Sequence, residues 1–280
     1  MTETAAGARA LTADDYYAEL TVRNRGLIPE SAQLALGKAR VLIAGCGSTG
    51  GAAVEPLVRL GVQDFVLAEP GEYELNNLNR QHARLDDLGR NKADRAAGTI
   101  REVNPHARAR VYGTGVQDDN VRELLDGVDV VIDGVDVTTL AGWRAKFLLH
   151  REAARRGVPV VSGYDMSGTQ FVRYYDYRVD PAPLAGRVTE EHLGAERVWD
   201  LLLRIIPREL VPEDLVQDIR ANGADTEYSI PQLVYTSHLF GVLAARYTVA
   251  VLAGWPVAAE VTVDVHGLVA TGTAPKEEER

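Results

Sequence analysis

The residues that most directly point to chemistry form a glycine-rich turn in the first fifth of the chain. The stretch Gly45-Cys46-Gly47-Ser48-Thr49-Gly50 matches the G-x-G-x-x-G pattern of nucleotide-binding turns. It follows an apolar run, 39–44, and opens a segment with helical spacing. Glycines in this setting permit a tight turn and close backbone approach, while the amino end of the helix favours phosphate charge. The pattern therefore predicts a nucleotide-binding turn.

An acidic residue follows at the distance expected for ribose binding. Glu69 ends the next apolar run and lies 19 residues beyond Gly50, where an acid can bind ribose hydroxyls. An acid at this position is found with NAD as well as with ATP. The glycine turn and Glu69 alone do not decide between these two nucleotides.

Basic and acidic residues farther along the chain favour a polyphosphate. The stretch 76–81 reads Asn-Asn-Leu-Asn-Arg-Gln, and Lys92 follows it. Arginine offers a planar fork and lysine a point charge, a combination that suits a triphosphate. Asp136 comes after the fourth predicted strand and could hold Mg²⁺ there, whereas its competitor Asp133 lies within the strand end. An NAD dehydrogenase does not need this set, and tight NADH binding would be required to favour that alternative.

The periodicity of apolar residues predicts the elements that position these groups. Short apolar runs alternate with helical segments, which implies crossover units and a parallel sheet with helices on both faces. The predicted strands are 39–44, 65–68, 109–112, 128–132 and 158–162, and the predicted helices are 50–60, 92–103, 118–125 and 144–156. After Gly163 a period of two predicts antiparallel strands at 170–179 and 260–265, with a helix at 231–253. The fold class is therefore α/β and Rossmann-like, with a mixed sheet.

Composition excludes several classes of protein. The chain has 280 residues, 46% hydrophobic and 25% charged, which is typical of a globular protein. A net charge of −10 disfavours broad nucleic-acid binding. One cysteine excludes an intrachain disulfide and a cysteine-rich zinc site, and it points to a reducing compartment. The apolar stretch 239–259 contains Arg246, so a buried helix is preferred to a membrane span, and we expect a cytoplasmic protein.

Taken together in their order and spacing, these motifs resemble the ThiF/MoeB/HesA superfamily, relatives of the ubiquitin-activating enzymes. The resemblance covers roughly residues 23–270. It rests on Arg23-Asn24-Arg25-Gly26 with Gln33, the glycine turn, Glu69, the 76–81 stretch, residues 89–92, the step from Asp133 to Asp136, residues 159–163 and the helix at 231–254. It implies a homodimer with an ATP-dependent adenylyltransferase activity. Members attack the α-phosphate of ATP with a carboxylate, giving an acyl-adenylate and pyrophosphate.

The resemblance also implies roles for individual residues. Gly45, Gly47 and Gly50 would pass under the nucleotide, and Glu69 would bind its ribose. The phosphate contacts would come from Asn77, Arg80, Gln81 and Lys92. Asp136 would hold Mg²⁺. Arg23, with Arg25 as the alternative, would reach the active site of the partner subunit as an arginine finger.

The chain departs from its relatives in three ways that bear on function. It lacks paired CxxC zinc motifs, it lacks an acceptor cysteine after the strand in the 170s, and the usual Asp-Asn step reads Asp136-Val137. Cys46, inside the glycine turn, is expected to be a buried filler. The predicted function is therefore activation of a carboxylate on a small protein, a peptide or a small-molecule acid, without a cysteine thioester. An adenylation-driven cyclodehydratase and a non-catalytic nucleotide-binding subunit remain as alternatives.

The domain organisation expected from the sequence is simple. Residues 1–15 are expected to be disordered, residues 16–272 to form a single adenylation domain, and residues 273–280 to form a disordered tail. Within the domain, residues 181–225 are polar and proline-containing, which predicts a helical or loop insertion, or a lid. A loop acid before this segment, Asp165, lies beside the predicted site and could position the substrate.

Overall fold

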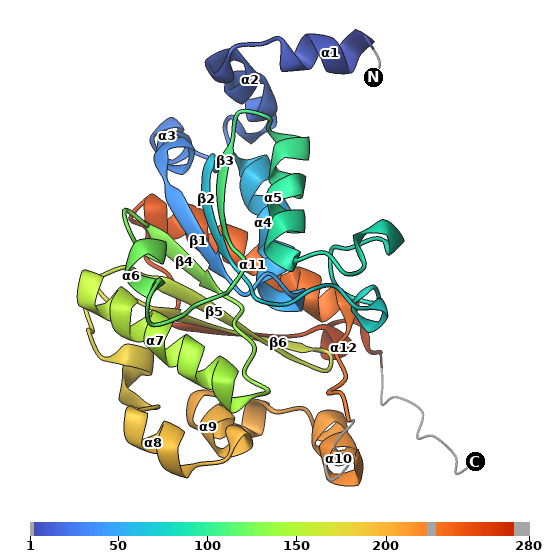
Figure 1. Ribbon diagram of the computed structural model, residues 1–280, viewed down its shortest axis with the longest axis vertical. Helices are drawn as coiled ribbons and strands as arrows, with labels where there is room; N and C mark the ends of the chain where they lie inside the picture. Colours follow the sequence, from blue (N-terminus) through green and yellow to red (C-terminus); the bar gives the residue numbers. More distant parts are fainter. Residues whose placement is uncertain (1–2, 223–227, 272–280) are drawn as a thin grey trace.

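A computed structural model describes residues 3–222 and 228–271 (Figure 1). Its centre is one mixed sheet in which the strands of the described residues follow the order β3-β2-β1-β4-β5-β6-β7. The first five strands run parallel, and β6 and β7 are antiparallel to their neighbours. The strands are β1 (Arg40–Ala44), β2 (Asp64–Ala68), β3 (Arg108–Tyr112), β4 (Val130–Asp133), β5 (Val160–Met166), β6 (Thr169–Tyr175) and β7 (Glu260–Asp264). The predicted fold class is confirmed.

Helices cover both faces of the sheet because successive strand residues point to opposite sides. Val41 and Ile43 of β1 pack with α4 (Ser48–Leu60), α5 (Lys92–Val103) and α11 (Val234–Leu252). Leu42 and Ala44 of the same strand pack on the other face with α6 (Val121–Leu124) and α7 (Leu140–Arg156). The strand order reverses between β2 and β4 on either side of β1, so the glycine turn opens at the point where ligands bind in such sheets.

The segment 181–225 is mainly helical where it is described. It contains the 3₁₀ turns η4 (Pro183–Gly186) and η5 (Arg208–Leu210) and the helices α8 (Glu190–Ala195), α9 (Val198–Ile205) and α10 (Glu213–Asn222). Leu193, Leu201 and Ile205 join the apolar cluster that contains Leu149 of α7. The segment therefore extends the layer formed by α7, beside which α8 and α9 lie in Figure 1.

The N-terminal segment differs from the expectation of disorder over residues 1–15. It includes α1 (Glu3–Arg9), in which residues 4–9 are exposed, and the start of α2 (Ala13–Leu20). Two tyrosines anchor α2 to the domain: Tyr16 donates to the carbonyl of Val103 at 2.6 Å and Tyr17 to that of Gln33 at 2.9 Å. A 3₁₀ turn, η1 (Val22–Asn24), leads to α3 (Glu30–Lys38). The predicted tail, 273–280, lies outside the described residues.

Several predicted elements have different bounds in the structure, and for one strand the reason is visible. The strand predicted at 158–162 extends to Met166 because β5 forms a hairpin with β6, in which Met166 pairs with Thr169. The apolar stretch after Leu239 contributes to α11, which packs against α4 and the sheet. None of the helices in the described part of the chain is both long and apolar enough to cross a bilayer. The last helix of the described residues is α12 (Val265–Val269).

Candidate active site

The glycine turn between β1 and α4 packs directly on the backbone of the loop after β4. Gly45 has a φ of +82° and donates its N–H to the carbonyl of Ala68 at 2.8 Å. A Cβ at Gly45 would collide with the carbonyl of Gly134, and a Cβ at Gly50 would collide with the carbonyl of Gly45. Gly134 in turn donates to Ala44 at 2.8 Å. Because these glycines have no side chains, the backbone of the turn can touch the backbone of the β4–α7 loop.

Replacing Gly45 by alanine should disrupt this contact. The left-handed backbone conformation costs a non-glycine residue about 1–2 kcal/mol, and the overlap with Gly134 adds about 1–3 kcal/mol. Denaturant unfolding should therefore show a loss of several kcal/mol, and nucleotide affinity should fall with it. Gly194→Ala in α8 is the matched control, since a Cβ there meets nothing within 4 Å. Equal stability of the two variants would contradict this account of the turn.

Glu69 lies at the end of β2 and holds the glycine turn in place. Its Oε2 accepts the N–H of Cys46 at 2.8 Å, and its Oε1 accepts the N–H of Gly71 at 2.7 Å. The carboxylate is thus fixed beside the turn, at the edge where the sequence predicts a ribose-binding acid. Cys46 is fully buried, and burial, with Glu69 adding to it, raises the pKa of its thiol. The thiol is therefore a packing group and a poor nucleophile.

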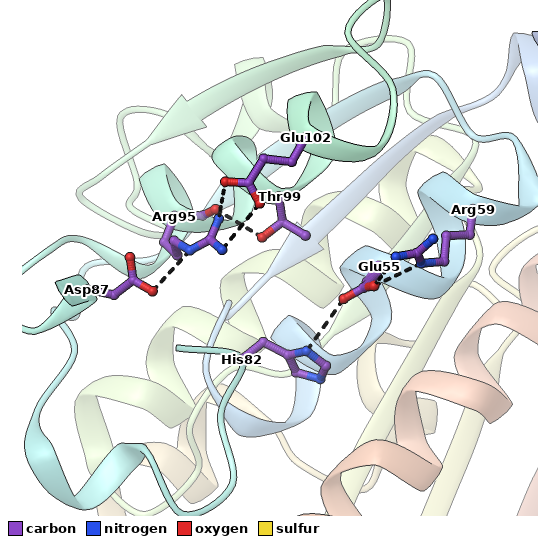
Figure 2. Close-up of polar contacts among 7 residues, drawn as sticks. All are labelled: Glu55, Arg59, His82, Asp87, Arg95, Thr99 and Glu102. Carbon is purple, nitrogen blue, oxygen red and sulfur yellow. Dashed lines mark hydrogen bonds and ion pairs between the residues drawn. The ribbon is translucent and has the colours of Figure 1, made fainter. Parts of the chain in front are cut away.

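The residues that directly follow the 76–81 stretch are tied to two helices (Figure 2). His82 contacts Glu55 of α4 at 4.0 Å, and Asp87 accepts from Arg95 of α5 at 3.1 Å. Just before His82, at the end of the 76–81 stretch, the side-chain amide of Gln81 faces Gly47, because a Cβ at Gly47 would lie 4.0 Å from both amide atoms. The Oε1 atom of Gln81 is buried and has no hydrogen-bond partner in the described parts of the chain. The amide is therefore placed to meet a ligand over the turn.

Asn77 has a more local role than the sequence predicts for it. It is buried in the 3₁₀ turn η2 (Leu75–Asn77), where its Oδ1 accepts the N–H of Glu74 at 3.1 Å and its Nδ2 donates to Asn76 at 2.6 Å. These bonds fix the backbone that leads to Arg80. Its contact with phosphate stays a prediction.

Arg80 projects toward the amino end of α4. Its Nε donates to Oε1 of Gln232 at 2.5 Å, and one terminal nitrogen donates to Asn76 and Asn79. All of these acceptors are neutral. Partial burial lowers the pKa of the guanidinium, and the charges of Asp165 and Asp136 oppose that shift. Arg80 is therefore a half-buried cation held in place by neutral acceptors, which leaves its charge available to an anionic ligand.

Lys92, the first residue of α5, approaches the turn from the side of β2. A Cβ on Gly71 would lie 3.5 Å from its Nζ and 2.8 Å from Oε1 of Glu69. The ammonium also lies 5.7 Å from the ring centroid of Tyr73. Lys92 and Arg80 thus approach the glycine turn from two sides, and their contact with a triphosphate stays a prediction.

The two acids after β4 have different environments. Asp136 is exposed, and its oxygens accept from the N–H and the hydroxyl of Thr138 at 2.8 and 2.9 Å. Asp133 is fully buried and accepts from Ser162 at 2.6 Å, from His150 at 2.9 Å and from Lys146. Asp133 is therefore occupied by the protein itself, whereas Asp136 faces solvent near Arg80.

The residues present fit a magnesium ion shared with a substrate. Among residues 3–222 and 228–271, no group of three or more His, Cys, Asp or Glu side chains is arranged to hold a metal. Mg²⁺ often binds through one or two carboxylates, several waters and the phosphates of a nucleotide. Asp136 is a suitable single carboxylate for such a site.

Four further polar side chains lie at the turn, and only Asp165 among them was singled out from the sequence. Oδ2 of Asp165, on β5, accepts from the hydroxyls of Ser48 and Thr49, each at 3.2 Å. Gln232, which comes just before α11, links Arg80 to Ser48. Ser48 and Thr49 stand inside the glycine motif and could have been singled out. Nothing in the sequence around Gln232 signals its position.

Arg23 and Arg25 lie away from the glycine turn of their own chain. Both are exposed, and the residue between them, Asn24, donates to the carbonyl of Leu60 at 3.3 Å. Leu60 ends α4, whereas the glycine turn is at the start of this helix, about 18 Å away at 1.5 Å per residue. Within one chain these arginines do not join the site. Their predicted action on a partner subunit stays a prediction.

Comparison with known proteins shows the family of the chain. The profile of the ThiF family matches residues 21–271, and the chain belongs to this family. It is 33% identical over 218 residues to the uncharacterized protein MT1398 of Mycobacterium tuberculosis, covering 76% of this chain and 29% of that protein. It is 33% identical over 125 residues to the SAMP-activating enzyme E1 of Haloferax volcanii, covering 44% of each. The chain thus spans less than half the length of these two relatives.

A third relative matches along most of its length. The tRNA threonylcarbamoyladenosine dehydratase of Escherichia coli is 29% identical over 227 residues, with 79% of this chain and 77% of that protein covered. The crystal structure of this E. coli enzyme, TcdA, superposes with a TM-score of 0.62 at 23% identity, covering 87% of this chain and 98% of the other. Another structure of TcdA contains ATP. The structural likeness supports the fold.

Proposed function

We propose that the chain is an ATP-dependent adenylyltransferase that activates a carboxylate as an acyl-adenylate and releases pyrophosphate. One observation supports this function above others: Arg80 and Lys92 flank the glycine turn, and Asp136 stands on the loop that packs against it. Membership of a family that includes adenylating enzymes supports the same activity.

The proposed reaction needs charge neutralisation more than proton transfer. An oxygen of the substrate carboxylate attacks the α-phosphorus of ATP, the bond from this phosphorus to the bridging oxygen breaks, and pyrophosphate leaves with the electron pair. No proton has to move in this step. The N–H groups at the start of α4 and the cations of Arg80 and Lys92 face the charge that develops on the phosphates. Mg²⁺ on Asp136 would neutralise further charge on the phosphates.

The acid is a small protein, a peptide or a small-molecule carboxylate. Similar proteins include the SAMP-activating enzyme E1 of Haloferax volcanii and E. coli MccB, solved with MccA, which favours a protein or peptide substrate. The proposal includes a homodimer in which Arg23, or else Arg25, of one chain reaches the site of the other, and a cytoplasmic location. Because the sole cysteine, Cys46, is buried in the turn, no thioester on this chain is part of the reaction.

The activity can be tested by exchange of labelled pyrophosphate into ATP. The screen should cover peptides that end in Gly-Gly and a panel of free carboxylic acids. We expect Mg²⁺-dependent exchange that requires one of these acids. Mg²⁺-dependent ATP binding without exchange for any acid would contradict the adenylation proposal and favour a non-catalytic nucleotide-binding subunit.

A cyclodehydratase is the second candidate, because the E. coli dehydratase matches over most of its length. It would show the same exchange. It differs in the second step, since a nucleophile within the activated substrate would displace AMP without an added acceptor, and the product would be lighter than the starting acid by the elements of water. Mass spectrometry of the product separates the two outcomes.

A further inference from the structure

A carboxylate that the adenylation step does not use lies beside the phosphate turn. Asp165 is on β5, next to β4, and the hydroxyls of Ser48 and Thr49 at the start of α4 both donate to its Oδ2. These two residues belong to the glycine turn itself. Asp165 therefore contacts the turn over which the acyl-phosphate bond of the adenylate would form.

The second oxygen of Asp165 is buried and free. Oδ1 is shielded from solvent and has no hydrogen-bond partner among the described residues. An ionised carboxylate oxygen that is buried without a hydrogen bond destabilises the folded protein unless a ligand supplies a donor. Oδ1 is thus placed to accept from a bound molecule.

Arg80 is the main charged side chain near Asp165. The start of α4 contributes neutral hydroxyls, α11 is preceded by the neutral Gln232, and Gln170 pairs with Asp165 across β6. The stretch over the turn contributes Arg80, whose charge favours ionisation, and Asp136 acts on the same arginine. Burial raises the pKa of Asp165 to about 6, and the two hydroxyls and Arg80 oppose this shift. Near neutral pH the group is mostly ionised and still able to take a proton.

We propose that Asp165 binds the ammonium group of a primary amine, which is the acceptor of the activated acyl group. This inference rests on the proposed adenylation and specifies its second substrate. It fits a chain whose sole cysteine is buried, because the nucleophile must then come from a substrate. The final product is an amide.

The transfer step is balanced as follows. The bound ammonium gives one proton to Oδ1 of Asp165, and the resulting amine attacks the acyl carbon of the adenylate with its lone pair. The bond from that carbon to the phosphate oxygen breaks, and AMP leaves with the electron pair. The nitrogen then releases its second proton to solvent, and Asp165 returns its proton to solvent at turnover. An α-amino group, with a pKa of about 8, is better matched to Asp165 than a lysine side chain at about 10.4.

The binding part of the proposal can be tested before the acid is known. Glycinamide is titrated calorimetrically into the full chain loaded with a non-hydrolysable ATP analogue and Mg²⁺, with N-acetylglycinamide as the neutral probe. We expect saturable binding of glycinamide alone. Asp165→Asn should abolish it, while Asp214→Asn should not, since Asp214 is an exposed acid that accepts from Ser167 near the same hairpin. Binding should weaken below about pH 6, where Asp165 becomes protonated. No binding, or equal binding by the Asp165→Asn variant, would overturn the proposal.

Transfer is tested with any acid that supports pyrophosphate exchange. Asp165→Asn should reduce amide formation with glycinamide by about 100-fold more than it reduces exchange, as expected for loss of a group that accepts a proton. Equal loss of both rates would assign Asp165 to the nucleotide and contradict its role toward the amine. Absence of exchange in the wild-type chain would instead count against adenylation, and the binding titration would still report on Asp165.

Discussion

Arg80→Ala is expected to lower acid-dependent pyrophosphate exchange by about 100- to 1,000-fold, the loss typical of removing one pre-positioned donor to a developing charge. Arg80 is held beside the start of α4 by Gln232, Asn76 and Asn79, all through neutral acceptors. Because these acceptors are uncharged, none of them neutralises the positive charge of the guanidinium. The rate of label exchange at saturating ATP and acid measures this effect.

Two further variants make the Arg80 result specific. Arg80→Lys keeps the charge but loses the planar fork, so it should recover a part of the activity. Arg59→Ala is the matched control, because Arg59 is an exposed arginine of α4 that pairs with Glu55. It should leave exchange within about twofold, since an exposed pair contributes little. Full activity of Arg80→Ala would show that the phosphates do not lie beneath this guanidinium.

Asp133→Ala is expected to destabilise the domain by about 3–5 kcal/mol, the cost of removing one partner from a buried ion pair. Asp133 and Lys146 are both fully buried, and His150 and Ser162 bind the same carboxylate. Removing Asp133 would leave the ammonium of Lys146 uncompensated between β4 and α7. Denaturant unfolding measures the loss.

The neighbouring acid gives the opposite pattern and serves as the comparison. Asp136→Ala removes an exposed carboxylate whose two hydrogen-bond donors are both on Thr138, so it should cost at most about 1.5 kcal/mol. It should nevertheless reduce Mg²⁺-dependent exchange strongly. A stable Asp133→Ala variant, or an unstable Asp136→Ala variant, would reverse the roles assigned to the two acids.

The pH dependence of stability gives a second readout for Asp133. Burial lowers the pKa of His150 despite the attraction of Asp133, so the stability that neutral His150 provides is complete above about pH 6.5 and declines below it. Burial opposes ionisation of Asp133, but Lys146 and His150 outweigh it and hold its pKa well below the usual range. Stability from Asp133 is therefore present above about pH 3.9 and is lost on further acidification. A stability that stays constant from pH 7 to pH 4 would contradict this assignment.

Local sequence patterns were sufficient for most of the fold. The spacing of apolar residues along each helix or strand follows from which of its faces is buried. That spacing can be read directly from the sequence. The helix predicted at 92–103 has these bounds in the structure, because Asn91 caps its start and the Asn104-Pro105 pair ends it. The glycine motif likewise predicted its own environment, since Gly45 and Gly50 contact backbone where a Cβ would not fit.

The parts that the sequence did not predict depend on contacts between distant residues. His150 and Lys146 both bind Asp133, and the sequence singled out neither of them as its partner. Gln232 meets Arg80 across 152 positions of sequence. No spacing rule connects such pairs, because the sheet order and the path of the chain before α11 bring them together. The position of Asp136 beyond the end of β4 could be predicted, and its role toward Mg²⁺ stays a prediction.

A crystal structure of the full chain with Mg²⁺ and a non-hydrolysable ATP analogue tests the central claim most directly. The account predicts that the α-phosphate lies over the N–H groups at the start of α4, with Arg80 and Lys92 in contact with the phosphates and the metal on Asp136. A nucleotide bound elsewhere, or one whose phosphates point away from Arg80 and Lys92, would contradict it.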